Sequence, residues 1–171
     1  MNSQHNAPAL SLHEQFDEAS TFQALRLLSH HQPGVPPSHL LLQLILADHH
    51  QLPQFGCSVS RDTLIRTEDS WVGLHAPAVM RALVSSPAQD APLPEYDELS
   101  QADLKSLEWV LGAHSRASLE ELRALTRWPS WEATAENEPL DLRLLILDFP
   151  CGAQLVEYLM DPHPGEAAIT S

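Results

Sequence analysis

Apolar residues recur at every third or fourth position along most of the chain, which is the spacing of helices that bury one face. The first such stripe begins at Leu12 and continues to Leu28, and it predicts an amphipathic helix over these residues. Prolines and a glycine between positions 33 and 37 interrupt the stripe, so we expect the helix to end before them.

A second run is apolar on almost every side from Leu40 to Ala47. A helix without a polar face needs neighbours all round, so this segment predicts the central helix of the fold. We expect Ser38 to be its N-cap, because a serine oxygen accepts hydrogen bonds from the free N–H groups of a first helical turn. Pro53 and Gly56 are expected to end it.

The helical spacing returns in the second half of the chain. One stripe covers residues 71–83, and Ser100 is placed to cap the helix that follows it. Ser118 and Glu121 have the spacing of a capping box, in which each residue bonds the other's backbone at a helix start. Residues 154–160 predict a last helix.

Two segments depart from helical spacing. Residues 57–67 alternate between apolar and polar over a short distance, which predicts a small β-hairpin. Residues 139–148 match the helical and the strand period equally, so both structures stay open there. Because leucine dominates the apolar runs, we expect a mainly α fold: a compact multi-helix domain with a small β-hairpin element.

The length of 171 residues suits one domain with a core of its own. We expect a single helical domain over residues 12–161, flanked by flexible tails at 1–11 and 162–171. Within the domain, residues 86–99 carry three prolines and four acidic residues, which predicts an exposed acidic, proline-rich loop.

Charge narrows the choice of partners. The chain has 23 acidic and 9 basic residues, for a formal net charge of −14. Such a surface repels phosphate backbones and anionic lipid, so we expect neither nucleic-acid nor membrane binding. The start of the chain lacks the pattern of a secretory signal, and Cys57 and Cys151 lack the spacing of a disulfide framework. These features predict a cytoplasmic protein.

Motifs for catalysis are missing from the sequence. The ten histidines include no metal-binding spacing, no serine or cysteine has a nucleophile signature, and no glycine-rich phosphate loop occurs. We therefore expect no enzymatic activity, metal or cofactor. The alternative is a metal-dependent enzyme that uses Asp48, His50 and Asp62 or His75.

The four tryptophans are the stronger signal for binding, because tryptophan supplies a large contact area and is enriched at interface hot spots. Trp71 and Trp131 stand at expected element boundaries and are the better candidates for a partner interface. The alternative is that the tryptophans fill a core that is short of other aromatic residues.

Two blocks of sequence resemble a known family, the Panacea-domain proteins or SocA-like antitoxins. In the first block, residues 40–66, a Leu-rich helix leads into an Ala-Asp pair, an aromatic-Gly step and a Val-Ser-x-Asp segment. The matching residues are Ala47, Asp48, Phe55, Gly56, Val59, Ser60 and Asp62. The second block, residues 99–134, has two serine-capped helices and then a Ser-Trp step at 130–131.

The resemblance implies a mainly α domain that neutralises a cognate toxin by direct binding, and it extends to possible delivery of the partner to a AAA+ protease. It adds the matching residues Asp48 and Asp62 to Trp71 and Trp131, and these four are the expected partner-binding residues. The chain departs from the family where Ser70–Val72 replaces Gly-Pro-Val and where Arg61 replaces a glycine. An interaction module of a phage or mobile element, with a different protein partner, is the alternative.

Overall fold

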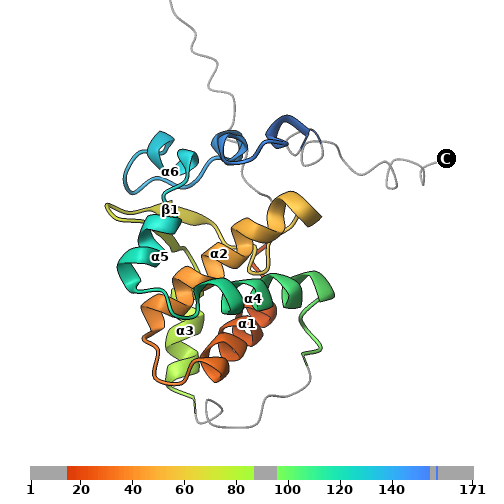
Figure 1. Cartoon of the computed structure of the whole chain (residues 1–171), viewed down its shortest axis with the longest axis vertical. Helices are drawn as coiled ribbons and strands as arrows, with labels where there is room; N and C mark the ends of the chain where they lie inside the picture. Colours follow the sequence, from red (N-terminus) through yellow and green to blue (C-terminus); the bar gives the residue numbers. More distant parts are fainter. Residues whose placement is uncertain (1–14, 87–95, 155–156, 158–171) are drawn as a thin grey trace, which may run out of the picture.

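Helix α2 runs through the middle of the fold, and the other elements pack around it (Figure 1). The structure is a computed structural model and describes residues 15–86, 96–154 and 157. Its elements are α1 (Glu18–His31), α2 (Pro37–Phe55), β1 (Leu64–Arg66), β2 (Trp71–Gly73), α3 (Ala76–Val84), α4 (Gln101–His114), α5 (Leu119–Leu125), α6 (Pro129–Ala133), α7 (Leu142–Leu145) and the 3-10 helix η2 (Ile146–Asp148). The predicted class, a mainly α compact domain with a small hairpin, is confirmed.

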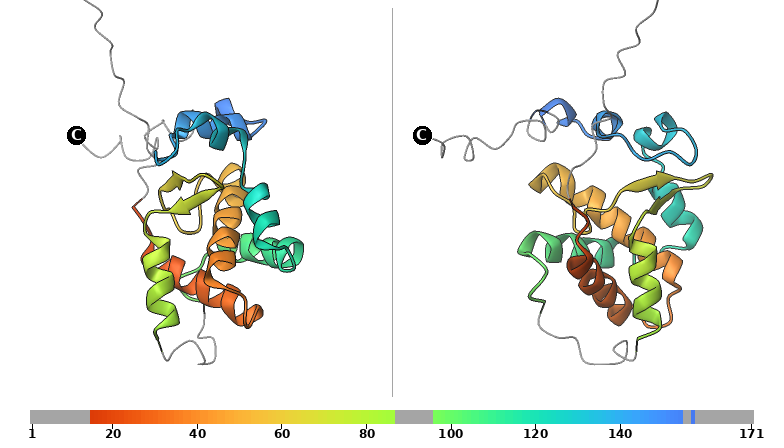
Figure 2. Two further views of the ribbon diagram at one scale, coloured as in Figure 1. Left: turned by 90° about the vertical axis from the view of Figure 1, so that its left-hand side faces the viewer. Right: turned by 180° about the vertical axis from the view of Figure 1, so that it is seen from behind.

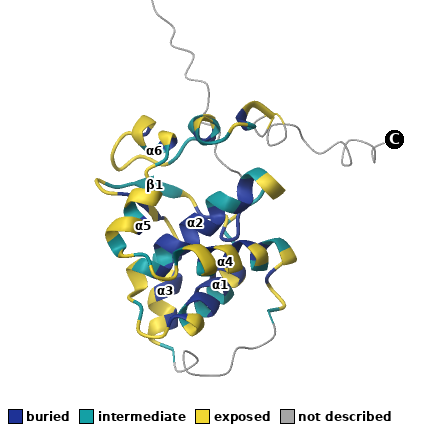
Figure 3. Ribbon diagram, viewed as in Figure 1, coloured by how far each residue is buried: buried dark blue, intermediate teal, exposed yellow. Residues whose placement is uncertain are grey.

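The central position predicted for α2 is also confirmed. Every residue from Leu42 to Asp48 is buried, so this part of the helix is covered on all its faces (Figure 3). Helices α1, α3, α4 and α5 and strand β2 all contact it. A segment that is apolar on every side can be buried only if neighbours surround it, and this is the arrangement of the fold.

Two buried glutamines tie α2 to its neighbours. The amide of Gln43 and that of Gln32, at the end of α1, each donate to the other's oxygen, at 2.8 and 2.9 Å. The amide of Gln51 donates to Asp103 of α4 at 2.8 Å. Each of these buried amides donates a hydrogen bond to a neighbouring element, and these contacts help to fix the orientation of α1 and α4 on the central helix.

The ends of α2 differ from the prediction. The helix begins at Pro37 and is preceded by Pro36, so Ser38 lies inside the first turn and is not the N-cap. Proline suits this position because the first helical N–H groups have no partner within the helix. Pro53 does not end the helix, which continues to Phe55 and stops at Gly56, where the backbone turns left-handed with a φ of 71°. A proline near the end of a helix removes only one backbone hydrogen bond.

The hairpin forms later in the chain than the sequence predicted. Its strands pair antiparallel with Leu64 opposite Gly73 and Arg66 opposite Trp71. The prediction of strand structure over 57–67 is therefore wrong for residues 57–63, and the helix expected over 71–83 begins only at Ala76. Both errors arise because the strands are three residues long, too short for a clear alternation.

The later elements follow the sequence more closely. The capping boxes Ser100–Asp103 and Ser118–Glu121 form as predicted, with both reciprocal bonds present. Residues 139–148 combine the two open alternatives: Pro139 bridges to the hairpin at Ile65, and the helices α7 and η2 follow.

Several sequence predictions lie outside the described residues. These are the tail at 1–11, the tail at 162–171, most of the loop at 86–99 and most of the helix at 154–160. In the described part of the chain, no helix combines the length and the apolar content that a membrane crossing requires.

The C-terminal elements α6, α7 and η2 lie together over the hairpin and the end of α2, at one end of the molecule in both further views (Figure 2). Backbone hydrogen bonds attach this layer to strand β1. The N–H of Leu140 donates to the carbonyl of Leu64 at 2.8 Å, and the N–H of Arg66 donates to the carbonyl of Glu138 at 3.0 Å. The hairpin is thus held between the helical core and this layer.

Candidate functional site

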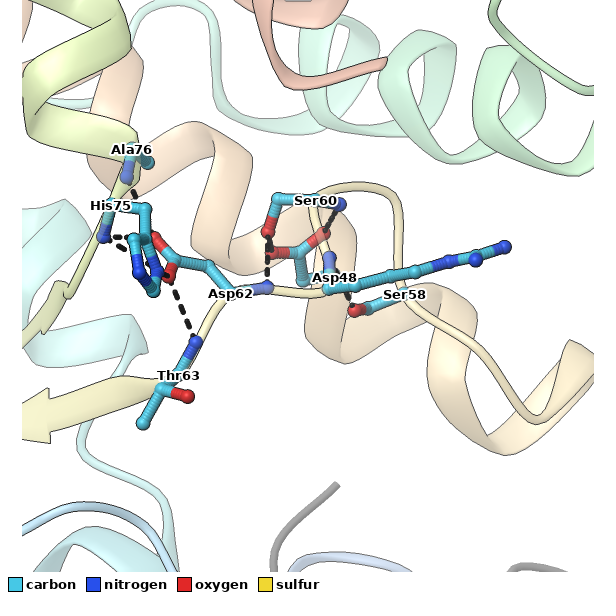
Figure 4. A network of polar contacts seen from close by, with 8 residues as sticks. Asp48, Ser58, Ser60, Asp62, Thr63, His75 and Ala76 are labelled. Carbon is cyan, nitrogen blue, oxygen red and sulfur yellow. Dashed lines mark hydrogen bonds and ion pairs between the residues drawn. The ribbon is translucent and has the colours of Figure 1, made fainter. Parts of the chain in front are cut away.

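Two aspartates of the family-like block lie close together where α2, the loop before β1 and the start of α3 meet (Figure 4). Asp48, on α2, accepts hydrogen bonds from the N–H of Ser60 at 2.9 Å and from its hydroxyl at 2.5 Å. The same hydroxyl oxygen accepts from the N–H of Asp62 at 3.2 Å. Ser60 therefore links the two aspartates.

Asp62 caps a helix from which it is separated by the whole hairpin. Its carboxylate accepts from the N–H of His75 at 3.0 Å and from the N–H of Ala76 at 2.7 Å, at the start of α3. It also accepts from the N–H of Thr63 at 2.9 Å and lies 2.9 Å from Nδ1 of His75. A carboxylate at a helix N-terminus satisfies free N–H groups and interacts favourably with the helix dipole.

Gly73 of β2 makes room for this carboxylate. A Cβ atom at that position would lie 2.4 Å from Oδ2 of Asp62, which is closer than two such atoms can approach. The absence of a side chain at Gly73 therefore allows Asp62 to reach the start of α3.

The loop also holds a left-handed residue. Arg61 has a φ of 54°, a conformation that glycine adopts freely and other residues adopt at a cost. The N–H of Arg61 donates to the hydroxyl of Ser58 at 3.1 Å, which helps to hold this turn.

Burial changes the electrostatics of Asp48. It raises the pKa of Asp48 from 3.8 to about 7, because the hydrogen bonds from Ser60 and from the backbone of Val59 only partly replace the lost hydration, and the nearby charge of Asp62 adds to the rise. Asp48 thus holds a proton near neutral pH far more readily than an ordinary aspartate does.

A cavity of about 190 Å³ adjoins this centre. Asp48, Ser60 and Asp62 contribute to its wall, and apolar side chains of α2 and the hairpin make up much of the rest. Its lining includes Val72, which is 37% exposed, and Ser38, which is also exposed, so the cavity reaches the surface. Leu74 follows the buried lining residue Gly73 in the chain and is 58% exposed.

Of the two tryptophans predicted to contact a partner, Trp71 lies in the hairpin and Trp131 lies on α6. Trp71 is buried and lines the cavity, and its indole N–H has no hydrogen-bond partner among the described residues. Trp131, on α6, is half-buried; its indole N–H donates to the carbonyl of Ser70 at 2.8 Å, and the guanidinium of Arg66 lies 4.2 Å from its ring centre. Trp131 therefore fastens the C-terminal layer to the hairpin.

Partner binding by Asp48, Asp62 and Trp71 stays a prediction, and their burial limits how it can occur. Each of the three is at most 9% exposed. A partner can reach them only by inserting a group into the cavity that they line.

The residues of the alternative metal site are not all brought together. His75 contacts Asp62, but the ring of His50 stacks on Trp109 of α4 at 3.8 Å, on a different part of the molecule. Among the described residues, no three histidine, cysteine, aspartate or glutamate side chains are grouped so that they could hold a metal ion.

A second polar cluster, which the sequence did not suggest, holds the C-terminal layer on α2. Asp148 accepts from the N–H and hydroxyl of Ser130, at 2.7 and 2.6 Å, and lies 3.1 Å from Nε2 of His49. The His49 ring stacks on Trp128 at 3.4 Å. Because serine and histidine both bond the aspartate and not each other, the histidine is not placed to take the proton of the hydroxyl. No local sequence pattern predicts this cluster, because His49 and Asp148 are 99 positions apart.

Comparisons with known proteins give no assignment: no family model, no curated protein and no solved structure shows a significant match to this chain.

Proposed function

We propose that this chain acts by binding a protein partner, in the manner of the SocA-like antitoxins that it resembles, and without converting a substrate itself. The observation that carries the proposal is the cavity beside the hairpin, with exposed apolar Val72 in its lining and exposed Leu74 two residues further along the chain. Exposed apolar side chains around a partly buried hollow are typical of protein interaction sites.

The polar groups at this site favour recognition over catalysis. The carboxylate of Asp62 is used to cap α3, and the hydroxyl of Ser60 is bonded to Asp48. The hydroxyl donates to a carboxylate, and among the described residues no histidine or lysine bonds it as the base of a nucleophilic serine would. These bonds hold the shape of the loop and of the cavity wall.

Charge favours a basic partner. With a net charge of −14, the chain attracts a positively charged protein at long range, which speeds association and disfavours acidic competitors. In the antitoxin function, the partner is the cognate toxin, and binding covers the surface that the toxin uses.

The test is co-expression with the product of the adjacent gene. We expect the wild-type chain to relieve the growth arrest that this product causes and to co-purify with it as a stable complex. A Leu74→Asp variant should lose both effects, because it places a charge at an exposed position next to the lining residue Gly73 without entering the core. Val84→Asp is the matched control: Val84 is 47% exposed at the far end of α3, and this variant should behave as wild type.

The outcomes separate the parts of the proposal. If the two proteins form a complex but toxicity is not relieved, protein binding is supported. The antitoxin function is then excluded, and the complex serves another purpose. If neither a complex nor relief is observed with wild type, or if Leu74→Asp and Val84→Asp behave alike, the proposed site is wrong.

A further inference from the structure

We propose that the cavity beside the hairpin receives a phenylalanine side chain of the protein partner. This inference rests on the proposed function, because it takes the occupant from a protein. It names the chemistry of that occupant: an apolar group of the size of one ring, which makes no hydrogen bonds inside the cavity.

Apolar side chains from several elements form most of the cavity wall. They include Leu41 and Ile45 of α2, Leu64 of β1 and Leu119 of α5. Val72 of β2 also lines the cavity and is 37% exposed, so the apolar wall continues to the surface of the protein. An apolar group that enters from outside therefore meets apolar side chains along its path.

The carboxylates in the wall are already bonded within the protein. Asp48 accepts hydrogen bonds from the N–H and the hydroxyl of Ser60, and the backbone of Val59 adds a further one. The carboxylate of Asp62 is used on the backbone N–H groups at the start of α3. These bonds are internal, so neither carboxylate depends on an occupant of the cavity for its partners.

The other polar groups of the wall are engaged in the same way. The hydroxyl of Thr67 donates to the carbonyl of Ser70 at 3.0 Å and accepts from its N–H at 3.1 Å. The guanidinium of Arg123 pairs with Glu120 at 2.7 Å, and Ser38 lies exposed at the surface. An occupant with a donor or acceptor would lose its hydration and meet groups that are already bonded, so an apolar occupant is favoured.

The size of the cavity selects among apolar side chains. A cavity of about 150 Å³ with apolar walls holds one benzene molecule. At about 190 Å³, the cavity here has room for such a ring and the methylene group that carries it. Valine and leucine would leave part of this volume empty, which forfeits packing contacts. Tyrosine and tryptophan would bring an O–H or N–H into the wall, so phenylalanine is the side chain that fits.

The phenylalanine must come from another protein. All four phenylalanines of this chain lie among the described residues, and none of them lines the cavity. A second copy of the chain would offer Phe55, which is 44% exposed, but each copy has a net charge of −14 and the copies repel each other. A basic partner is attracted by the same charge.

The first experiment adds toluene, the phenylalanine side chain as a free molecule, to the full-length protein. Binding is followed by backbone amide signals in a ¹H–¹⁵N spectrum. We expect toluene to shift the signals of the lining residues Val72 and Gly73 and to leave that of Gly112, on the open face of α4, in place. p-Cresol, which adds a hydroxyl to the same ring, should bind about tenfold more weakly, because this hydroxyl loses its hydrogen bonds to water.

A matched pair of variants tests the location. Leu41 and Leu104 are partly buried leucines that pack on the main core, and of the two only Leu41 lines the cavity. Leu41→Phe places a ring in the wall and should abolish the shifts that toluene causes, whereas Leu104→Phe should preserve them. If Leu41→Phe does not fold, the comparison of toluene with p-cresol on the wild type still decides the question.

The second experiment uses the complex with the product of the adjacent gene. Toluene should weaken this complex, and one phenylalanine-to-alanine change in the partner should weaken it by about thirtyfold, the effect of a hot-spot residue.

Four results would overturn the inference. The first is the absence of toluene binding, and the second is p-cresol binding as tight as that of toluene. The third is a stable complex that neither toluene nor any single phenylalanine-to-alanine change in the partner weakens, in which case the proposed function would stand without the phenylalanine. The fourth is a dimer of this chain that Phe55→Ala dissociates and toluene weakens, which would make a second copy the occupant. Toluene binding without any complex would overturn the proposed function as well and leave a site for a small apolar molecule.

Discussion

Replacement of Asp48 by asparagine should change how the stability of the fold depends on pH. In the folded protein the pKa of Asp48 is about 7, whereas in the unfolded chain it takes its ordinary value of 3.8. Between these two values the folded state binds the proton and the unfolded state does not. The free energy of unfolding contributed by Asp48 therefore falls as the pH rises from 4 to 7, and it is constant outside this window.

The size of the effect follows from the two values. A difference of about three pH units, at about 1.4 kcal/mol for each, corresponds to roughly 4 kcal/mol. Asparagine has nearly the same shape as aspartate and does not titrate. The free energy of unfolding of Asp48→Asn should therefore not show this fall with rising pH. Relative to the variant, the wild-type protein should lose about 4 kcal/mol of stability between pH 4 and pH 8.

Urea denaturation of both proteins at pH 4.5, 6 and 8 provides the measurement. Other titrating groups, such as His49 with its pKa lowered by burial, are present in both proteins and cancel in the difference. Parallel curves for wild type and Asp48→Asn would refute the reasoning. They would show that the carboxylate is hydrated or bonded well enough to keep an ordinary pKa.

Two further predictions concern the backbone around the site. Gly73→Ala should lower the free energy of unfolding by about 2 kcal/mol, because the new Cβ displaces Asp62 from the start of α3; Gly112→Ala, on the open face of α4, should raise it by about 1 kcal/mol. If Gly73→Ala and Gly112→Ala changed the free energy of unfolding equally, in thermal or urea denaturation, Asp62 would be able to move aside without loss of stability. Arg61→Gly should be stabilising or neutral, within about 1 kcal/mol, because glycine adopts the φ of 54° without strain. A loss of more than that amount, measured in the same way, would show that the Arg61 side chain stabilises the loop.

Local signals explain which parts of the fold could be predicted. Ser100 and Ser118 were placed correctly because a capping box is defined within four residues of sequence. Leu40 to Ala47 predicted the central helix because burial on every side leaves no polar face in the sequence. The hairpin was misplaced because strands of three residues carry too little alternation, and Trp71 happened to continue the helical spacing of α3.

The site depended on contacts between distant residues, which local patterns do not record. The resemblance pointed to Asp48 and Asp62, but not to the bonds that hold them. The requirement for a glycine at 73 follows from a carboxylate eleven positions earlier, and only the folded geometry shows it. The contact between Asp148 and His49 joins η2 to the central helix α2 in the same way.

The cap that Asp62 provides has a consequence for how the domain opens. The start of α3 has no capping side chain of its own, so its first N–H groups depend on a residue located before the hairpin. Separating the two strands would pull the carboxylate from the helix and release the first turn of α3, which packs on α1. Hairpin and helix should therefore exchange their amide protons as one cooperative unit, with a common opening free energy. Force applied to the hairpin is in this way transmitted to α3 and, through α3, to α1.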